Sequence, residues 1–71
     1  MKIDYDKEAD AMYIEIRKGE FARNKKVDDI TIIDLDEEGN ILGIELLEVS
    51  KRDPAQSLKK IYVKNLQVVA Q

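Results

Sequence analysis

The sequence predicts an α+β fold, in which an antiparallel β-meander of about five strands is followed by a short helix and a final strand. Apolar and polar residues alternate through much of the first half of the chain, and this period of two is typical of a strand with one covered face. Two runs rich in β-branched residues, DDITIIDL and ILGIELLEV, flank a turn signal, which predicts a hairpin. After Ser50 an Asp-Pro pair indicates the start of a helix.

The first two expected strands are Lys2 to Tyr5 and Ala11 to Ile16, because apolar side chains alternate along both. The polar residues Asp6 to Asp10 connect them. A third strand, about Glu20 to Val27, carries one arginine and two lysines. Charged side chains discourage further pairing, so we expect this strand at an edge of the sheet.

The central hairpin is expected from Ile30 to Asp36 and from Asn40 to Glu48. Its turn, DEEG, has Asp at the first and Gly at the fourth position of a type I turn, and Gly39 supplies the positive φ of a G1 bulge. Asp36 is then opposite Asn40, which fixes the register of the two strands. Counting back along the strands gives these opposed pairs: Leu35 and Ile41, Asp34 and Leu42, Ile33 and Gly43, Ile32 and Ile44, and Thr31 and Glu45.

This register gives the hairpin apolar residues on both faces. A sheet with one face in water should be polar on that side, so we expect the hairpin to be covered twice, once by the protein itself and once by a partner. The predicted partner is a second copy of the chain, in a homodimer. The interface candidates are Ile33, Leu35, Ile41, Gly43 and Leu47.

The C-terminal part of the chain predicts a helix followed by a strand. Asp53 is a suitable N-cap and Pro54 a suitable first helical residue, so a short helix should extend to about Lys60. Residues 61–70 fit a helical stripe as well as a strand. Their β-branched content favours the final strand.

Length and composition limit the class of protein. The 71 residues form one domain, residues 1–71, and a domain of this size has a small core. The chain contains neither Cys nor His, so disulfides and the usual zinc sites are excluded, and self-association is the leading way to add stability. No apolar run approaches the roughly 20 residues that span a bilayer. We therefore expect a soluble, cytoplasmic protein with no membrane partner.

The net charge of -3 argues against strong non-specific binding to phosphate backbones. The alternative function is nucleic-acid binding through a basic hairpin from Arg17 to Lys26, which would lie in a groove as a two-stranded ribbon. A charged edge that prevents aggregation explains the same residues more simply. A nucleic-acid partner is therefore the less favoured interpretation.

The segment DLDEEGNILGIE, from Asp34 to Glu45, resembles the pattern of a calcium loop. Asp34, Asp36 and Glu38 take its first, third and fifth positions. In the predicted register, however, Asp34 and Glu45 lie on opposite faces of the sheet and roughly 10 Å apart, and the flanking runs favour strands over helices. We therefore prefer a turn, leave these three carboxylates as weak metal candidates, and expect no cofactor.

No catalytic residue is predicted. The chain has no His and no Cys, and its two serines lack the glycines of a nucleophile elbow. The carboxylates Asp4, Asp6, Glu8 and Asp10 are candidates for acid–base chemistry, but a polar turn in which Asp10 caps the next element explains them more simply. We expect no enzyme activity.

Two segments, YDKEADAMYI and VDDITIIDLDEEGNILGIELLEVSKR, together resemble the small prokaryotic family catalogued as domain of unknown function 2283. The resemblance covers about residues 1–52. The matching residues are Tyr5, Asp6, Glu8, Ala9, Asp10, Ala11, Tyr13, Ile14, Asp34, Asp36, Gly39, Gly43, Ile44, Glu45, Leu47 and Ser50. Val49 stands where many members of the family have Ala.

The resemblance implies a compact, β-rich protein and brings no catalytic residue and no cofactor. Relatives near genes for small toxin-like proteins imply an accessory or antitoxin-like role, with such a toxin-like protein as partner. The residues and the resemblance together predict a small non-enzymatic protein-interaction module that forms a homodimer.

Overall fold

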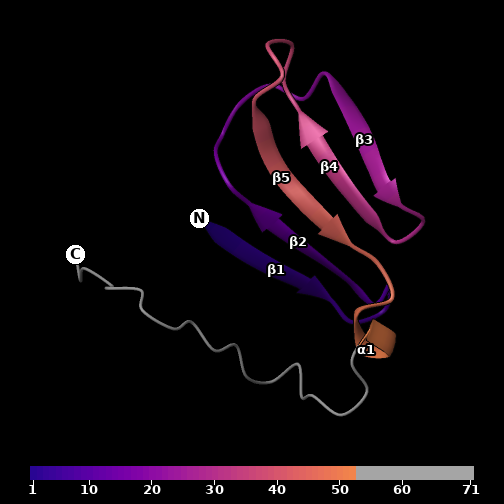
Figure 1. Ribbon diagram of the computed structural model, residues 1–71. Coiled ribbons are helices and arrows are strands. Elements are labelled where there is room, and N and C mark those ends of the chain that lie inside the picture. Colours follow the sequence, from indigo (N-terminus) through magenta and orange to yellow (C-terminus); the bar gives the residue numbers. More distant parts are fainter. Residues whose placement is uncertain (53–71) are drawn as a thin grey trace, which may run out of the picture.

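The computed structural model describes residues 1–52, which form five strands and one turn of helix (Figure 1). The elements are β1 (Lys2–Asp6), β2 (Ala11–Glu15), β3 (Arg23–Asp28), β4 (Thr31–Leu35), β5 (Ile41–Leu46) and α1 (Val49–Arg52). The helix expected to begin at Asp53 and the strand expected at 61–70 lie outside the described residues. The observed α1 begins earlier, soon after β5 ends.

All four strand pairs are antiparallel, and the order across the sheet is β1-β2-β5-β4-β3. The five antiparallel strands and the edge position of β3 confirm the expectation. The order departs from a simple meander at one point, because β2 pairs with β5 instead of β3. Residues 16–22 connect β2 to the start of β3 at the far edge (Figure 1). Strands β2 to β5 therefore form a Greek key.

The turn between β4 and β5 forms as its sequence predicts. The Asp36 amide donates to the Asn40 carbonyl at 3.0 Å, and the Gly39 amide donates to the Asp36 carbonyl at 3.1 Å. Gly39 has a φ of 86°, a conformation that glycine adopts without steric cost. The Asp36 carboxylate also accepts from the amides of Glu38 and Asn40, so its side chain fixes the turn.

Beyond this turn the register departs from the simple count. Leu35 is opposite Ile41 as expected, but Asp34 is opposite Gly43 instead of Leu42. Leu42 is therefore the extra residue of a β-bulge. Every pair predicted from Asp34 back to Thr31 is shifted by one residue.

Contacts from the β2–β3 connection hold the bulge at Leu42. The Leu42 carbonyl accepts from the amides of Ile16 and Arg17, at 2.7 and 3.1 Å. The Leu42 side chain is buried, and a Cβ atom at Gly19 would lie 2.7 Å from its Cδ2 atom. The residues that hold the bulge are thus more than 20 positions away in the sequence, and the hairpin alone carries no signal for it.

The bulge decides which side chains share a face, since a shift of one residue moves a side chain to the other side of the sheet. We call one side the apolar face, with Ile3, Tyr5, Met12, Ile14, Ile33, Leu35, Ile44 and Leu46. We call the other side the polar face, with Asp4, Tyr13, Glu15, Ile32, Asp34, Gly43 and Glu45. The expectation that both faces of the hairpin are apolar is wrong, because it used the register without the bulge.

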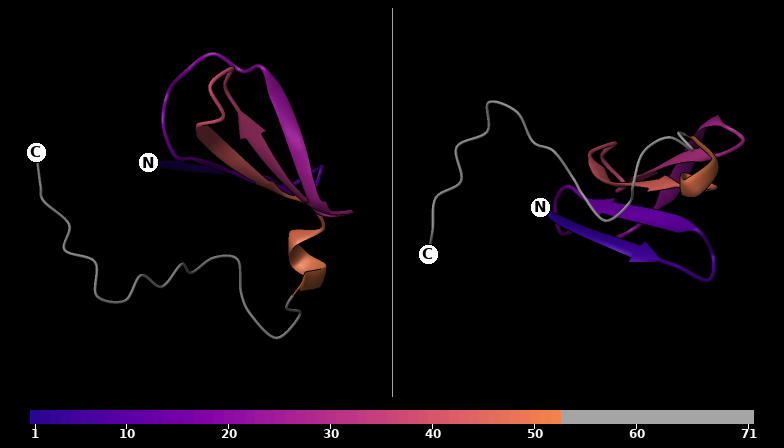
Figure 2. Two further views of the ribbon diagram at one scale, coloured as in Figure 1. Left: turned by 45° about the horizontal axis from the view of Figure 1, so that its top comes forward. Right: turned by 90° about the horizontal axis from the view of Figure 1, so that it is seen from below.

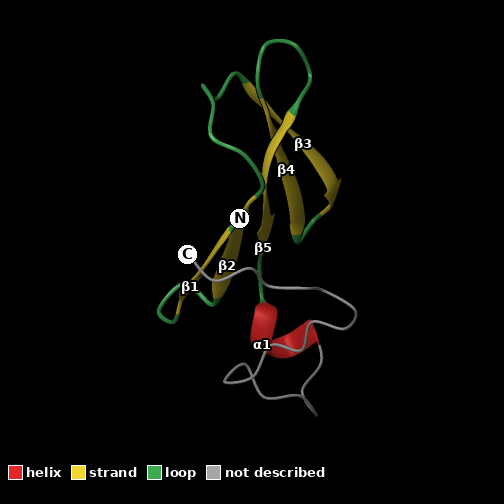
Figure 3. Ribbon diagram, turned by 90° about the vertical axis from the view of Figure 1, so that its left-hand side faces the viewer, coloured by secondary structure: helices red, strands yellow, loops and turns green. Residues whose placement is uncertain are grey.

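The described part of the chain is a single twisted layer (Figure 2). Within residues 1–52, the only buried apolar side chains are Leu42 and Val49. The short helix α1 lies beyond the ends of the strands and not over the sheet (Figure 3). No helix in residues 1–52 is long and apolar enough to cross a membrane.

Candidate functional site

Four isoleucines form a row across the apolar face, one on each of four neighbouring strands. Ile3 is opposite Ile14, Ile14 is opposite Ile44, and Ile44 is opposite Ile33. Neighbouring strands lie about 4.8 Å apart, so the row extends over roughly 15 Å. The next row consists of Tyr5, Met12, Leu46 and Thr31.

The side chains of the apolar face are incompletely covered. Ile3 is 41% exposed and Tyr5 39% exposed, and the other six are half-buried. A sheet normally buries its apolar side against a second layer. The described elements either belong to the sheet or lie beyond its end, so that layer has to come from elsewhere. The apolar face is therefore the main candidate for a binding surface.

The structure brings three of the five predicted interface residues to this face. Ile33 and Leu35 lie on it, and Ile41 is opposite Leu35 at its margin, with 42% of its surface exposed. Gly43 lies on the polar face. Leu47 follows the end of β5 and is half-buried, and its amide donates to the Ile30 carbonyl at 2.8 Å.

The central residues of the apolar face, Ile14 and Ile44, were missed as interface candidates. The alternation of β2 does place Ile14 on one face with Met12. The predicted register, however, paired Ile44 with Ile32, which lies on the polar face. Only the position of the bulge assigns Ile44 to the same side as Ile33.

On the polar face, Tyr13, Asp34 and Glu45 surround Gly43. Tyr13 is opposite Glu45, and Asp34 is opposite Gly43. A Cβ atom at Gly43 would overlap the Tyr13 hydroxyl and lie 2.9 Å from the Ile14 carbonyl oxygen. Gly43, predicted as an interface residue, is therefore approached closely by Tyr13 of the same chain.

The two carboxyl groups on this face lie close together. Burial raises the pKa of the Glu45 carboxyl, and the neighbouring Asp34 raises it further. Burial likewise raises the pKa of the Tyr13 hydroxyl, again with a contribution from Asp34. The Oδ1 atom of Asp34 is buried and has no hydrogen-bond partner among residues 1–52. The expectation that Asp34 and Glu45 lie on opposite faces is wrong, because the bulge at Leu42 shifts the register by one residue.

The weak metal candidates do not form a calcium loop. The Oδ1 atom of Asp36 accepts from two backbone amides, at 2.9 and 2.8 Å, and its Oδ2 atom accepts from the Asn40 side chain at 3.0 Å. Both oxygens are thus used by the turn, while Glu38 is exposed. Within residues 1–52, no three His, Cys, Asp or Glu side chains are placed to hold a metal ion together.

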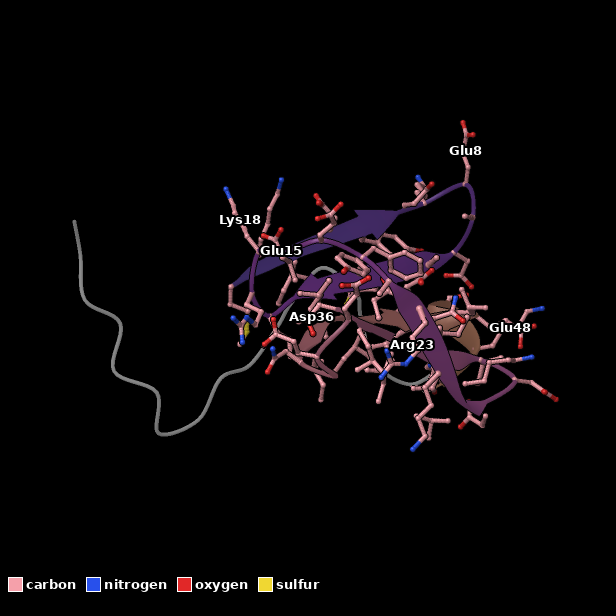
Figure 4. The ribbon with its side chains drawn as sticks, turned by 90° about the horizontal axis from the view of Figure 1, so that it is seen from above. Glu8, Glu15, Lys18, Arg23, Asp36 and Glu48 are labelled. Atoms are coloured by element: carbon pink, nitrogen blue, oxygen red, sulfur yellow. The ribbon has the colours of Figure 1, made fainter. Side chains whose placement is uncertain are left out.

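The acidic residues between β1 and β2 have structural partners. The Asp6 carboxylate accepts from the amides of Glu8 and Ala9, at 3.0 and 3.2 Å, which is the local hydrogen bonding of an Asx turn. Glu8 points away from the sheet at the outer end of this turn (Figure 4). Asp4 lies on the polar face, across β1–β2 from Tyr13. This arrangement supports the polar-turn interpretation over an acid–base site.

Asp10 joins this turn to α1. Its carboxylate accepts from the Ser50 amide at 3.1 and 3.3 Å, from the Ser50 hydroxyl at 2.7 Å and from the Tyr5 hydroxyl at 2.9 Å. Its carbonyl accepts from the Val49 amide at 3.1 Å. The hydrogen bond from Ser50 is the main reason that the pKa of Asp10 is lowered. Three of the residues that carry the family resemblance, Tyr5, Asp10 and Ser50, therefore form one structural contact.

Arg52 joins the other end of α1 to the start of β4. Its guanidinium donates to the Leu47 carbonyl at 2.9 Å, to the Thr31 hydroxyl at 2.9 Å and to the Ile30 carbonyl. Helix α1 is therefore bonded to the β1–β2 turn through Ser50 and to the start of β4 through Arg52.

The basic segment from Arg17 to Lys26 is not a hairpin. Its first residues lie in the connection after β2, and the last four lie in β3, which pairs with β4. Arg23 and Lys25 are opposite Leu35 and Ile33, so both lie beside the apolar face, whereas Lys26 lies on the other side. The predicted two-stranded basic ribbon is therefore absent from the described residues.

The part of the chain that matches known proteins is nearly the same as the part that the structure describes. A family model described as "Protein of unknown function (DUF2283)" matches residues 2–50. An uncharacterised protein of Methanocaldococcus jannaschii is 41% identical over 51 residues, which cover 72% of this chain and 43% of the relative. The chain thus spans less than half the length of that relative. No solved structure matches the chain.

Proposed function

Because the chain belongs to the DUF2283 family, whose description states no function, we propose a function from the geometry of its sheet. The protein is a non-enzymatic protein-interaction module that forms a homodimer through the apolar face. The observation that carries this proposal is the row of Ile3, Ile14, Ile44 and Ile33, which the described elements leave open.

The composition of the face supports an interface. Its eight residues include no charged side chain, while Arg23 and Lys25 lie on the same side along the edge strand β3. An apolar centre beside a charged margin is the usual arrangement of a protein interface. Burial of apolar surface contributes about 25 cal/mol per Å², so covering half-exposed isoleucines is the main favourable term available to this sheet.

The occupant of the apolar face in this proposal is a second copy of the chain. The family match ends at residue 50, so the apolar face belongs entirely to the matched part of the chain. The matched part of a second chain can cover this face with its own apolar face. A twofold axis pairs one patch with itself, and two sheets stacked in this way pack about 10 Å apart. Ile14 and Ile44, on the two middle strands of the patch, then lie near the axis.

The first test is the mass of the full chain by light scattering. We expect a dimer for the natural sequence and a monomer for Ile44→Lys, because the lysine places a charge in the centre of the interface. Asn24→Lys is the matched control, since it adds the same charge at an exposed position opposite Asp34 and should leave the dimer intact. A natural chain that stays monomeric at every accessible concentration contradicts the proposal.

A cysteine variant keeps the test decisive if Ile44→Lys does not fold. The chain contains no Cys, so Ile44→Cys has a single thiol, which should form a disulfide-linked dimer under mild oxidation. Asn24→Cys, on the other face, should stay monomeric on a reducing-agent-free gel. Equal crosslinking of both variants argues against the face-to-face dimer. A monomer that binds a small toxin-like protein through Ile44 would also contradict it and would identify the other occupant.

A further inference from the structure

On the polar face, neither Asp34 nor Glu45 forms an ion pair with a cationic side chain of residues 1–52. Their neighbours across the sheet are Gly43 and Asn24 for Asp34, and Tyr13 and Ile32 for Glu45. None of these four side chains is cationic. Two ionised carboxylates would therefore repel each other, with no ion pair within residues 1–52 to offset the repulsion.

The bulge places the two groups within reach of each other. Glu45 is two residues beyond Gly43, the partner of Asp34, so the two carboxyl-bearing residues are diagonal neighbours, about 7–8 Å apart at the backbone. The longer Glu side chain spans that distance. At the same place, the Oδ1 atom of Asp34 is buried and lacks a donor within the described part of the chain, and a buried acceptor without a donor is costly.

We propose that Asp34 and Glu45 share one proton in the folded protein, carried by Glu45 and donated to Oδ1 of Asp34, and that this proton stabilises the bulged register of β4 and β5. The pair then has one negative charge instead of two, and the buried oxygen has its donor. Two carboxyl groups in contact retain a proton for this reason, because both cannot ionise at low cost.

The proton is linked to the register because only the bulged register brings the two groups together. Without the bulge they would lie on opposite faces of the hairpin, where each would ionise independently. A proton that binds one register and not the other stabilises the first. The shared proton thus favours the arrangement in which the isoleucines of β4 and β5, Ile33 and Ile44, lie on one face.

Other titratable and charged groups of residues 1–52 lie on the same side of the sheet, and two of them are diagonal neighbours in the register, Lys26 of Asp34 and Glu15 of Glu45. The acidic ones are Asp4 and Asp6 of β1 and Glu15 of β2, and the basic ones are Lys2, Lys26, Arg17 and Lys18. The acidic groups favour retention of the proton and the basic groups oppose it. The pKa of Glu45 is raised, first by burial and then by Asp34, which agrees with retention of the proton.

The test is the stability of the full chain between about pH 5 and 8, measured by urea denaturation at a fixed protein concentration. The chain has no His and no Cys, so no other side chain ordinarily titrates in this range. A group with a raised pKa stabilises the fold fully below its ordinary value of 4.5 and loses that contribution as the pH rises through the raised value. The unfolding equilibrium constant should therefore increase by up to about tenfold per pH unit there.

Glu45→Gln should remove this dependence, because its amide donates to Asp34 at every pH. Glu15→Gln is the matched control, since it removes a carboxyl from the same face outside the pair, and it should keep the dependence. Should Glu45→Gln fail to fold, carboxyl ¹³C titration of the natural chain decides, with the pKa of the Glu45 carboxyl expected to be raised by burial and by the neighbouring Asp34. A flat stability profile for the natural chain, or a Glu45 carboxyl that titrates at its ordinary value, overturns the proposal.

Discussion

The two faces of the sheet are built from the same five strands but meet different requirements. On the apolar face, apolar side chains of four strands stand in rows and most of them are half-buried. On the polar face, Tyr13 covers a buried glycine, and two carboxyl groups approach each other. The described elements leave the apolar face uncovered, whereas the polar face has contacts within residues 1–52.

The difference between the faces depends on one residue, Leu42. Without the bulge, Ile44 would join Ile32, and Glu45 would lie away from Asp34. With it, the apolar residues of β4 and β5 gather on one side, and the carboxyl groups on the other. A single inserted residue in one strand therefore separates the apolar face from the polar face.

The largest effect is expected from Gly43→Val, which breaks the polar face. The Cβ atom of any side chain at this position would overlap the Tyr13 hydroxyl and lie 2.9 Å from the Ile14 carbonyl oxygen. Backbone cannot yield as a flexible side chain does, so the free energy of unfolding should fall by about 3 kcal/mol or more in urea denaturation. Gly19→Ala is the control, because its Cβ meets only the end of the Leu42 side chain. An equal loss in both variants would contradict the role given to Gly43.

A smaller effect is expected from Ile14→Ala, which tests whether the apolar face is covered in solution. Truncation of a covered isoleucine lowers the free energy of unfolding by about 2 kcal/mol or more. Phe21→Ala is the comparison, since Phe21 is 56% exposed and lies outside the face; its cost should be well below that of Ile14→Ala. If the two variants lose the same stability in urea, the apolar face is bare.

Asp10→Ala changes a residue outside both faces, which contacts the apolar face only through the Tyr5 hydroxyl, and it should lower the melting temperature by an intermediate amount. It removes the acceptor for Ser50 and Tyr5. Because the pKa of Asp10 is lowered by the Ser50 hydrogen bond, the carboxylate stabilises the fold above its ordinary value of 3.8. That contribution is lost as the pH falls through the lowered value, which is the opposite sign to Glu45. Glu8→Ala, at the exposed end of the same turn, should leave both the melting temperature and its acid dependence unchanged.

The smallest effect is expected from Lys2→Ala. Lys2 and Asp4 form an ion pair at 3.7 Å, but both side chains are 70% exposed, and such pairs contribute little to stability. The melting temperature should not change measurably, at low or at high salt. A salt-dependent loss would show that β1 has a cover at this edge.

Local signals in the sequence predicted the strands and the β4–β5 turn well, but not the helical turn α1 at Val49–Arg52. Asp36 and Gly39 determine a turn whose hydrogen bonds all lie within five residues, so its geometry could be inferred from the residues alone. The strands followed from alternation, and the edge position of β3 followed from its charges. Asp10 was expected to cap the next element along the chain, whereas its carboxylate accepts from Ser50 of α1, 40 residues away.

Contacts that are distant in the sequence could not be predicted in the same way. The pairing of β2 with β5 brings the amides of Ile16 and Arg17 to the Leu42 carbonyl, and alternation within either strand carries no information about that meeting. The candidate surface was therefore only partly found, with Ile33 and Leu35 included and Ile14 and Ile44 left out.

By itself, the sequence determined where the strands and turns form, because those depend on residues within a few positions of one another. Only the tertiary structure decided which residues of neighbouring strands share the apolar face and which share the polar face. A register depends on how two strands pair. The register of β4 and β5 includes the bulge at Leu42, and the pairing of β5 with β2 holds that bulge. The apolar face and the Asp34–Glu45 pair both follow from that one contact.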